Sequence, residues 1–200
     1  MGDIGSRRSD YLLLAAMVLA PLAAIALIMC LAILGARGPL YSAAIDAVTG
    51  LDGRHDLNPL FNLTLRVASR SIFTGDCTAP GTVVEVSYAG VPLAAGPVPR
   101  FCTKRREARE LHAVVAWGEA LKVPGFVLDG LAADALRGPQ VFDVAVTMPS
   151  THSSGHHGTM VSCTGLRVGD TASLGATCAA SDVDTVVTLP RPSGKVDGAN

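Results

Sequence analysis

The longest hydrophobic run of the chain lies near its N-terminus. From Tyr11 to Ala36 no residue is charged, and twelve Leu, Ile or Val residues fall between Leu12 and Leu34. As a helix, residues 11–34 would rise about 36 Å, slightly more than the roughly 30 Å hydrocarbon core of a bilayer. The run therefore predicts one transmembrane helix over residues 11–34.

A cleaved signal peptide is the alternative interpretation of this run. The apolar region of such a peptide is normally about 7–15 residues long and ends in small residues of the A-x-A kind. The run here is longer, and Leu34-Gly35-Ala36 is a poor cleavage site, so the sequence favours an uncleaved anchor. A myristoylation pattern at 1–6 and a twin-arginine pattern at 6–8 are short enough to arise by chance.

Beyond the run, hydrophobic residues recur with a period of two. Phe61, Leu63, Leu65 and Val67 alternate with polar or small residues, as in a half-buried strand. The same reasoning predicts strands at Thr82–Tyr88, Leu111–Trp117, Val141–Met148, Met160–Val168 and Val183–Leu189. Residues 35–56, which are rich in Gly, Ala and Ser, are expected to form a stem with little fold of its own.

Turn signals separate these predicted strands. They are Pro80-Gly81, 90–99, Pro124-Gly125, Gly138-Pro139 and 150–158. One short helix is predicted from an apolar stripe, with Asp129 as its cap; the stripe is Leu131, Ala132, Ala135 and Leu136. Short strands with frequent turns predict an all-β fold, an antiparallel β-sandwich of the fibronectin type III or immunoglobulin kind, over residues 57–190. A flexible tail would follow at 191–200.

Composition narrows the classes of partner. The chain is 49% hydrophobic and 16% charged, with a mean hydropathy of +0.39 and a net charge of −1. The apolar excess is concentrated in the N-terminal run. Nothing in this charge balance provides the basic surface that nucleic-acid phosphates require, so the membrane is the predicted partner and nucleic acid is not.

Four cysteines follow the predicted transmembrane helix: Cys77, Cys102, Cys163 and Cys178. An even number suits two disulfides in an oxidising compartment. Pairing in sequence order, Cys77–Cys102 and Cys163–Cys178, is the most direct of three open connectivities. Cys30 lies inside the apolar run and is interpreted as a filler.

Three features agree on orientation. Arg7, Arg8 and the amino terminus precede the predicted helix, whereas Arg37 is the one basic residue in the next fifteen positions. Because basic residues are retained in the cytosol, residues 1–10 are predicted to be a short cytosolic tail. The cysteines and the sequon Asn62-Leu63-Thr64, a predicted glycosylation site that the strand alternation points outward, place the rest of the chain on the other side.

One charged cluster is a candidate contact patch. Lys104, Arg105 and Arg106 are interpreted either as part of a solvated loop or short helix that joins two strands or as a contact for anionic cell-wall polysaccharide or lipid headgroups, since such partners suit arginine. Trp117 is predicted to lie in the core rather than to form a sugar platform.

No catalytic motif is recognisable in the sequence. A nucleophile elbow, an H-E-x-x-H zinc pair, a phosphate loop and a C-x-x-C pair are all absent, so no enzymatic activity is expected. His152, His156 and His157 are close enough to ligate a metal, but their Ser- and Gly-rich surroundings predict a solvated loop. Neither a metal nor a cofactor is therefore expected.

Several segments are similar to a known family. NPLFNLTLRV at 58–67, YAGVPL at 88–93, VVAWG at 114–118 and VPG at 123–125 resemble the late-embryogenesis-abundant group 2 domain of land plants. The resemblance covers about Leu57 to Val168, and the nearest subgroup is the membrane-anchored proteins similar to hairpin-induced and non-race-specific disease resistance proteins. It implies a fibronectin-like sandwich at the plasma membrane, without enzymatic activity. Roles in pathogen or abiotic stress responses, through other membrane proteins or cell-wall components, are further expectations.

The sequence thus predicts a membrane-anchored interaction protein of plant defence or stress, with its domain outside the cell. The alternative is a lipid- or small-ligand-binding β-sandwich at the membrane surface. An exposed apolar cavity would favour the alternative, and a filled core with a polar surface would favour the first hypothesis.

Overall fold

The computed structural model describes residues 4–35, 38–52, 57–149 and 158–183. The chain divides into two compact units, which are described separately. The first contains residues 1–40 with the segments 67–76 and 102–109. The second contains the remainder of the β-sheet domain.

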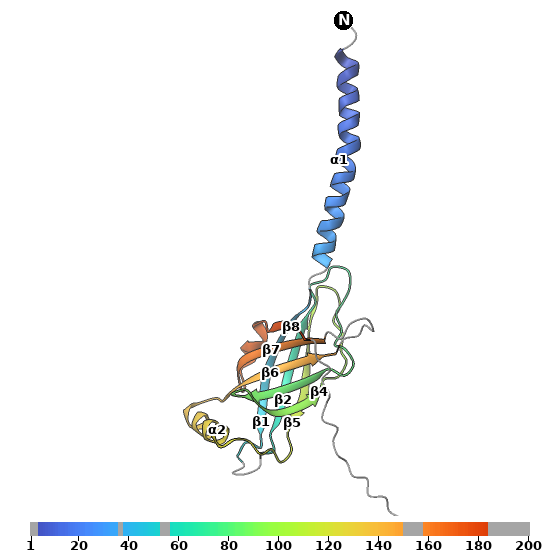
Figure 1. Ribbon diagram of the computed structural model, residues 1–200. Helices are drawn as coiled ribbons and strands as arrows, with labels where there is room; N and C mark the ends of the chain where they lie inside the picture. The colour runs from blue at the N-terminus through green and yellow to red at the C-terminus, as the bar shows by residue number, and fades with distance from the viewer. Residues whose placement is uncertain (1–3, 36–37, 53–56, 150–157, 184–200) are drawn as a thin grey trace, which may run out of the picture. The chain divides into compact units, whose positions relative to one another are not determined.

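Helix α1 (Ile4–Gly35) dominates the first unit (Figure 1). Its stretch Ala16–Ile33 has a mean hydropathy of 2.7, and none of these residues is buried. A helix of this length and composition fits a membrane anchor or a signal sequence, because such exposed apolar surface is unfavourable in water. The predicted span at 11–34 lies inside α1, but the helix begins earlier and includes residues 4–10 of the expected tail.

Eight strands form the domain. They are β1 (Leu40–Thr49), β2 (Leu60–Ala68), β3 (Val83–Tyr88), β4 (Val91–Pro97), β5 (Ala108–Trp117), β6 (Val141–Met148), β7 (Gly158–Arg167) and β8 (Ala179–Val183). Helix α2 (Gly125–Arg137) joins β5 to β6, and the short 3₁₀ helix η1 (Thr171–Gly175) lies between β7 and β8. All eight strands belong to one sheet in the order β1-β2-β5-β4-β3-β6-β7-β8.

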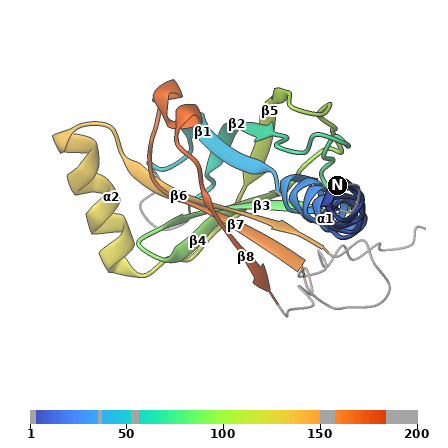
Figure 2. The same cartoon turned by 90° about the horizontal axis from the view of Figure 1, so that it is seen from above.

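This sheet curls into two layers. Figure 2 shows β1, β2 and β5 above β3, β4, β6, β7 and β8, with the strands of the two layers crossing. The layers join where β4 meets β5, and the backbone register there consists of the single pair Ala95↔Trp117. Gly96 lies next to this corner, and a side chain at Gly96 would collide with the Val115 carbonyl oxygen. The close approach of β4 and β5 therefore requires glycine at this position.

The free margins of the sheet meet on the opposite side. Ile45 of β1 forms a parallel bridge with Val168, and its carbonyl accepts a hydrogen bond of 2.8 Å from the Gly169 amide. The Tyr41 carbonyl accepts another of 2.8 Å from Cys178. These bonds close the curled sheet around its core.

Aromatic packing fills the space between the layers. Phe61 of β2 and Phe142 of β6 are fully buried, and their rings meet edge to face with centroids 5.1 Å apart. Tyr88 of β3 also packs against Phe142, with ring centroids 5.9 Å apart. Edge-to-face aromatic pairs contribute about 0.5–1.5 kcal/mol beyond their area burial. The interior of the sandwich is thus occupied by side chains.

The expected all-β antiparallel fold is confirmed, and the structure adds that both layers belong to one curled sheet. The alternation predicted for β2 is confirmed, since Phe61, Leu63, Leu65 and Val67 are buried. In β6 the predicted inward set is also buried: Phe142, Val144, Val146 and Met148.

The predicted stem is wrong for its central part. Residues 40–49 form β1, in which Ala43, Ala44 and Ile45 are buried in the core. Small side chains made this segment resemble a linker, but they allow the other layer to approach closely. The domain therefore begins at Leu40, five positions after the last residue of α1.

Two other boundaries differ from prediction. The segment expected as a turn at 90–99 contains β4, which pairs with β3 through the turn residues Ala89 and Gly90, both at positive φ. Such a two-residue turn matches the twist of a hairpin. Among the described residues the last strand is β8 at Ala179–Val183, which the sequence did not predict; the strand predicted at 183–189 lies outside the described residues except for Val183.

Replacing Ile45 by Ala tests whether β1 is part of the core. The loss of a fully buried side chain should lower the free energy of unfolding by about 2–5 kcal/mol. The exposed Thr49 of the same strand provides the control, and Thr49→Ala should change stability by less than about 0.5 kcal/mol. Denaturant titration of the detergent-solubilised chain measures both; equal effects would contradict the assignment of β1 to the core.

Candidate binding groove

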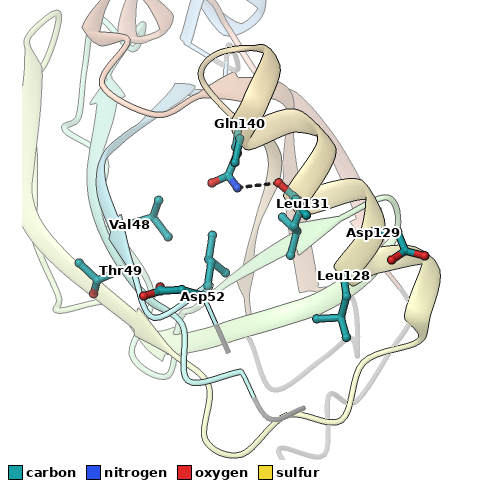
Figure 3. A pocket seen from close by; sticks show the side chains of 10 residues that line it. Val48, Thr49, Asp52, Leu128, Asp129, Leu131 and Gln140 are labelled. Atoms are coloured by element: carbon teal, nitrogen blue, oxygen red, sulfur yellow. Dashed lines mark hydrogen bonds between the residues drawn. The ribbon is translucent and has the colours of Figure 1, made fainter. Parts of the chain in front are cut away.

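An open cavity of about 590 Å³ lies between the end of β1 and helix α2. Figure 3 shows Val48, Thr49 and Asp52 on one side of it and the helix with Leu128 and Leu131 on the other. Among the described residues the lining is Val48, Thr49, Leu51, Asp52, Leu128, Asp129, Leu131, Ala132, Ala135 and Gln140. We call this cavity the β1–α2 groove.

Helix α2 begins earlier than the sequence indicated. Its first residue is Gly125, directly after Pro124, so the prediction that Asp129 caps the helix is wrong. Gly138, at φ 148°, ends it, as expected from the Gly-Pro signal. Val127 and Leu131 are the residues that α2 buries.

Only part of the predicted apolar stripe is buried. Leu131 packs into the core, whereas Ala132 and Ala135 are exposed along the groove and Leu136 is 90% exposed. Phe126 at the start of α2 is 60% exposed. Helix α2 therefore packs on the domain through Val127 and Leu131 and leaves apolar side chains exposed along the groove.

A polar clasp fixes α2 to the sheet. The Tyr88 hydroxyl of β3 donates a hydrogen bond of 2.7 Å to the Asp134 carboxylate of α2. Gly130 permits this approach, because a side chain there would come within 2.7 Å of the Tyr88 hydroxyl oxygen. At the end of the helix, the Gln140 amide donates to the Leu131 carbonyl at 3.1 Å (Figure 3). These contacts keep the wall of the groove in place.

The chemistry of the groove favours apolar ligands. Aliphatic side chains supply most of its described lining, and its acidic groups, Asp52 and Asp129, stand on opposite walls (Figure 3). Among the described lining residues there is no His, Cys, Ser or Lys. The described residues of the chain also contain no group of three metal-ligating side chains. The groove thus offers burial of apolar surface with a few polar contacts, as small-molecule sites do.

A polar network that the sequence did not indicate crosses β1, β2 and β5. The Thr64 hydroxyl donates to Asp46 at 2.8 Å and lies 3.1 Å from His112 Nδ1. Glu110 stands 3.8 Å from His112 Nε2 and 4.0 Å from Arg66. Thr64 is 2% exposed, so its hydroxyl is inaccessible to a substrate, whereas Asp46 and His112 are exposed. The members of the network are 18 to 48 positions apart in the bonded pairs, which explains why no local pattern revealed it.

The predicted disulfide cysteines are oxidised. Cys163 of β7 and Cys178 are bonded, with Cα atoms 4.6 Å apart, which confirms this predicted pair. Cys77 and Cys102 are each disulfide-bonded as well, and Cys30 is a free cysteine in the described chain.

Asn62 is exposed on β2, pointing away from the core as predicted. Its glycosylation stays a prediction. Trp117 is 45% exposed at the end of β5, so the prediction that it lies in the core is wrong. The strand is buried only at Val114 and Ala116 near its end, and Trp117 is on the other face.

Lys104, Arg105 and Arg106 are all exposed. They lie in a turn in which the Glu107 amide donates to the Lys104 carbonyl at 3.2 Å. In the part of the chain that the structure describes, none of the three forms an ion pair. The predicted metal candidates His152, His156 and His157 lie outside the described residues.

Comparison of the chain with family models, curated proteins and solved structures finds no match.

The clasp between Tyr88 and Asp134 should make the seating of α2 sensitive to pH. Burial, with the hydrogen bond and the negative charge of Asp134, raises the pKa of Tyr88 above its ordinary value of 10.0. A raised pKa means that the protonated phenol stabilises the fold, so this contribution is complete below about pH 10 and is lost as the pH rises through the raised pKa. Wild-type stability should therefore fall more steeply above pH 10 than that of Tyr88→Phe. Parallel slopes in denaturant titrations of the two proteins would contradict the clasp.

Proposed function

We propose that this chain is a non-enzymatic, single-pass membrane protein that displays an interaction domain outside the cytosol. The observation that carries the proposal is the joining of two features. Helix α1 exposes an uninterrupted apolar surface, and the disulfide-bonded domain begins five positions after it. A lipid bilayer would bury the apolar surface of α1, and an oxidising compartment would keep the disulfides of the domain formed.

The finer assignment rests on the sequence. The positive charges before α1 and the sequon at Asn62 support a cytosolic N-terminus and an extracellular domain at the plasma membrane. The resemblance to the hairpin-induced-like proteins supports a role in plant defence or abiotic stress, through other membrane proteins or cell-wall components. The filled core between the two layers favours a domain that works through its surface.

Glycosylation at Asn62 tests this orientation. If the domain enters the secretory pathway, the chain should carry a glycan that an endoglycosidase removes, and Asn62→Gln should migrate like the treated wild type. Asn58→Gln is the matched control, since Pro59 follows Asn58 and prevents modification there. A chain without glycan, with free thiols at Cys163 and Cys178, would show that the domain faces the cytosol.

The β1–α2 groove supports a second candidate function, the binding of a lipid or another small apolar ligand. Its volume of about 590 Å³ lies within the range of roughly 300–1,000 Å³ that is typical of small-molecule sites. Its walls are mostly aliphatic, and Ala132 and Ala135 of α2 are exposed along it. Such a ligand would bind against the helix rather than between the two layers, which are filled.

Blocking the groove tests this candidate. Ala135→Trp places a large ring in the lining and should lower the fraction of chain that carries a bound apolar molecule several-fold. Leu136→Trp is the control, because Leu136 is the next residue of α2 but is 90% exposed and outside the lining. Native mass spectrometry of the full chain released from micelles measures the bound fraction. Equal occupancy in both variants would exclude the groove as the binding site.

A further inference from the structure

Two loops of the first unit form one braced surface. Residues 69–76 follow β2 and residues 102–109 lead into β5; we call them together the basic loop pair. The Ser69 amide donates to the Glu107 carbonyl at 2.9 Å, and the Thr103 amide donates to the Asp76 carbonyl at 2.8 Å. The Thr103 hydroxyl adds a bond of 3.2 Å to the same carbonyl. The two loops therefore present their side chains as a single patch.

This patch is positively charged, although the chain as a whole has a net charge of −1. It contains five basic residues and two acidic ones, Asp76 and Glu107. The basic residues are all exposed: Arg70, Lys104, Arg105, Arg106 and Arg109. Within the described residues none of the five forms an ion pair, so their charge is available to an anionic partner.

An exposed aromatic ring stands in the same patch. Phe73 is 58% exposed, and its backbone amide donates to the Ser71 hydroxyl at 3.2 Å. The Thr74 amide donates to the same hydroxyl at 3.1 Å. The turn thus holds the ring outside the protein, where it loses the burial that would otherwise stabilise it.

Arg106 occupies a strained backbone position. Its φ is +55°, a left-handed conformation that glycine adopts freely and that costs energy for a residue with a side chain. An arginine at this position is unfavourable for the turn itself. This strained, exposed position points to a use for the side chain beyond the local structure.

The place of the patch along the chain decides its partner. The loop pair belongs to the same compact unit as α1 and Leu40, the first residue of β1. Residues 36–39 alone separate α1 from Leu40, which limits their separation to about 18 Å. Exposed Phe rings beside Lys and Arg side chains are typical of protein surfaces that bind the interface between lipid and water. An anionic polysaccharide would explain the charge but not the exposed phenyl ring.

We propose that the basic loop pair docks on the bilayer that α1 enters, with its basic side chains on lipid phosphates and Phe73 inserted among the headgroups. The inference rests on the anchor put forward under the proposed function. Docking of the loop pair would restrict the motion of the domain relative to the membrane.

Lipid quenching of an introduced indole tests the proposal in the full chain. The chain has a single tryptophan, Trp117, at the far end of β5, about 30 Å along the strand from Ala108. Phe73→Trp in a Trp117→Phe background is reconstituted into vesicles of brominated phosphatidylcholine with phosphatidylglycerol. The indole at position 73 should be quenched and blue-shifted, whereas Trp117 of the wild type should be neither.

Charge variants test whether the indole at position 73 reaches the lipid because the basic side chains bind the bilayer or only because α1 holds the loops near it. Lys104→Gln, Arg105→Gln and Arg106→Gly, combined in the Phe73→Trp chain, should abolish the quenching, and the glycine relaxes the turn so that folding is preserved. The control combines Lys122→Gln, Arg137→Gln and Arg167→Gln, which remove three exposed charges elsewhere and should leave the quenching unchanged.

Vesicle flotation separates failure of the anchor from failure of the docking. A chain that does not float with vesicles overturns the anchor and this inference together. A chain that floats with an unquenched indole at position 73 overturns the inference alone. If polygalacturonate shifts the emission of that unquenched indole, the patch binds polysaccharide instead of lipid.

Discussion

The domain depends on the contact between Phe61 and Phe142 across its interior. These two rings belong to strands in different layers, and they can meet only if one eight-stranded sheet turns back on itself. The turn is made at the single register pair between β4 and β5, where Gly96 lets the backbones approach. The opposite side is held by the Ile45 carbonyl and its partner Gly169. The corner between β4 and β5, the closing hydrogen bond between Ile45 and Gly169 and the aromatic contact together allow a single sheet to bury its apolar face.

Sequence patterns predicted the elements whose burial is one-sided. In β2 and β6 every second residue enters the core, so the period of two is unambiguous. In β1 the core positions include Ala43 and Ala44, and in β4 they include Ala94 and Gly96, so these segments lack an alternation of large apolar and polar residues. At Gly96 the small size is needed because the Val115 carbonyl lies close by, and no local pattern contains that information. The prediction that Trp117 lies in the core was wrong for a related reason: apolar composition does not indicate which face of a strand points inward.

The candidate site was predictable in its parts but not in its assembly. The apolar stripe of α2 was visible in the sequence, yet only Leu131 is buried and the two alanines line the groove. The opposite wall comes from residues 48–52, about eighty positions earlier, in a segment expected to have little fold of its own. Tyr88 and Gly130, which seat the helix, are recognisable only once β3 and α2 are in contact. The disulfide between Cys163 and Cys178 was predictable because it spans a short loop.

The position of β1 has a mechanical consequence. This strand follows α1, the candidate membrane anchor, after residues 36–39, and it also supplies the core residue Ile45 and the closing bonds of the sheet. Under the proposed anchoring, force between the membrane and the domain would enter the domain at Leu40, the first residue of β1. Cutting the chain before β1 would leave every strand of the sheet in the domain, whereas cutting after β1 would remove the strand that supplies Ile45 and the closing bonds.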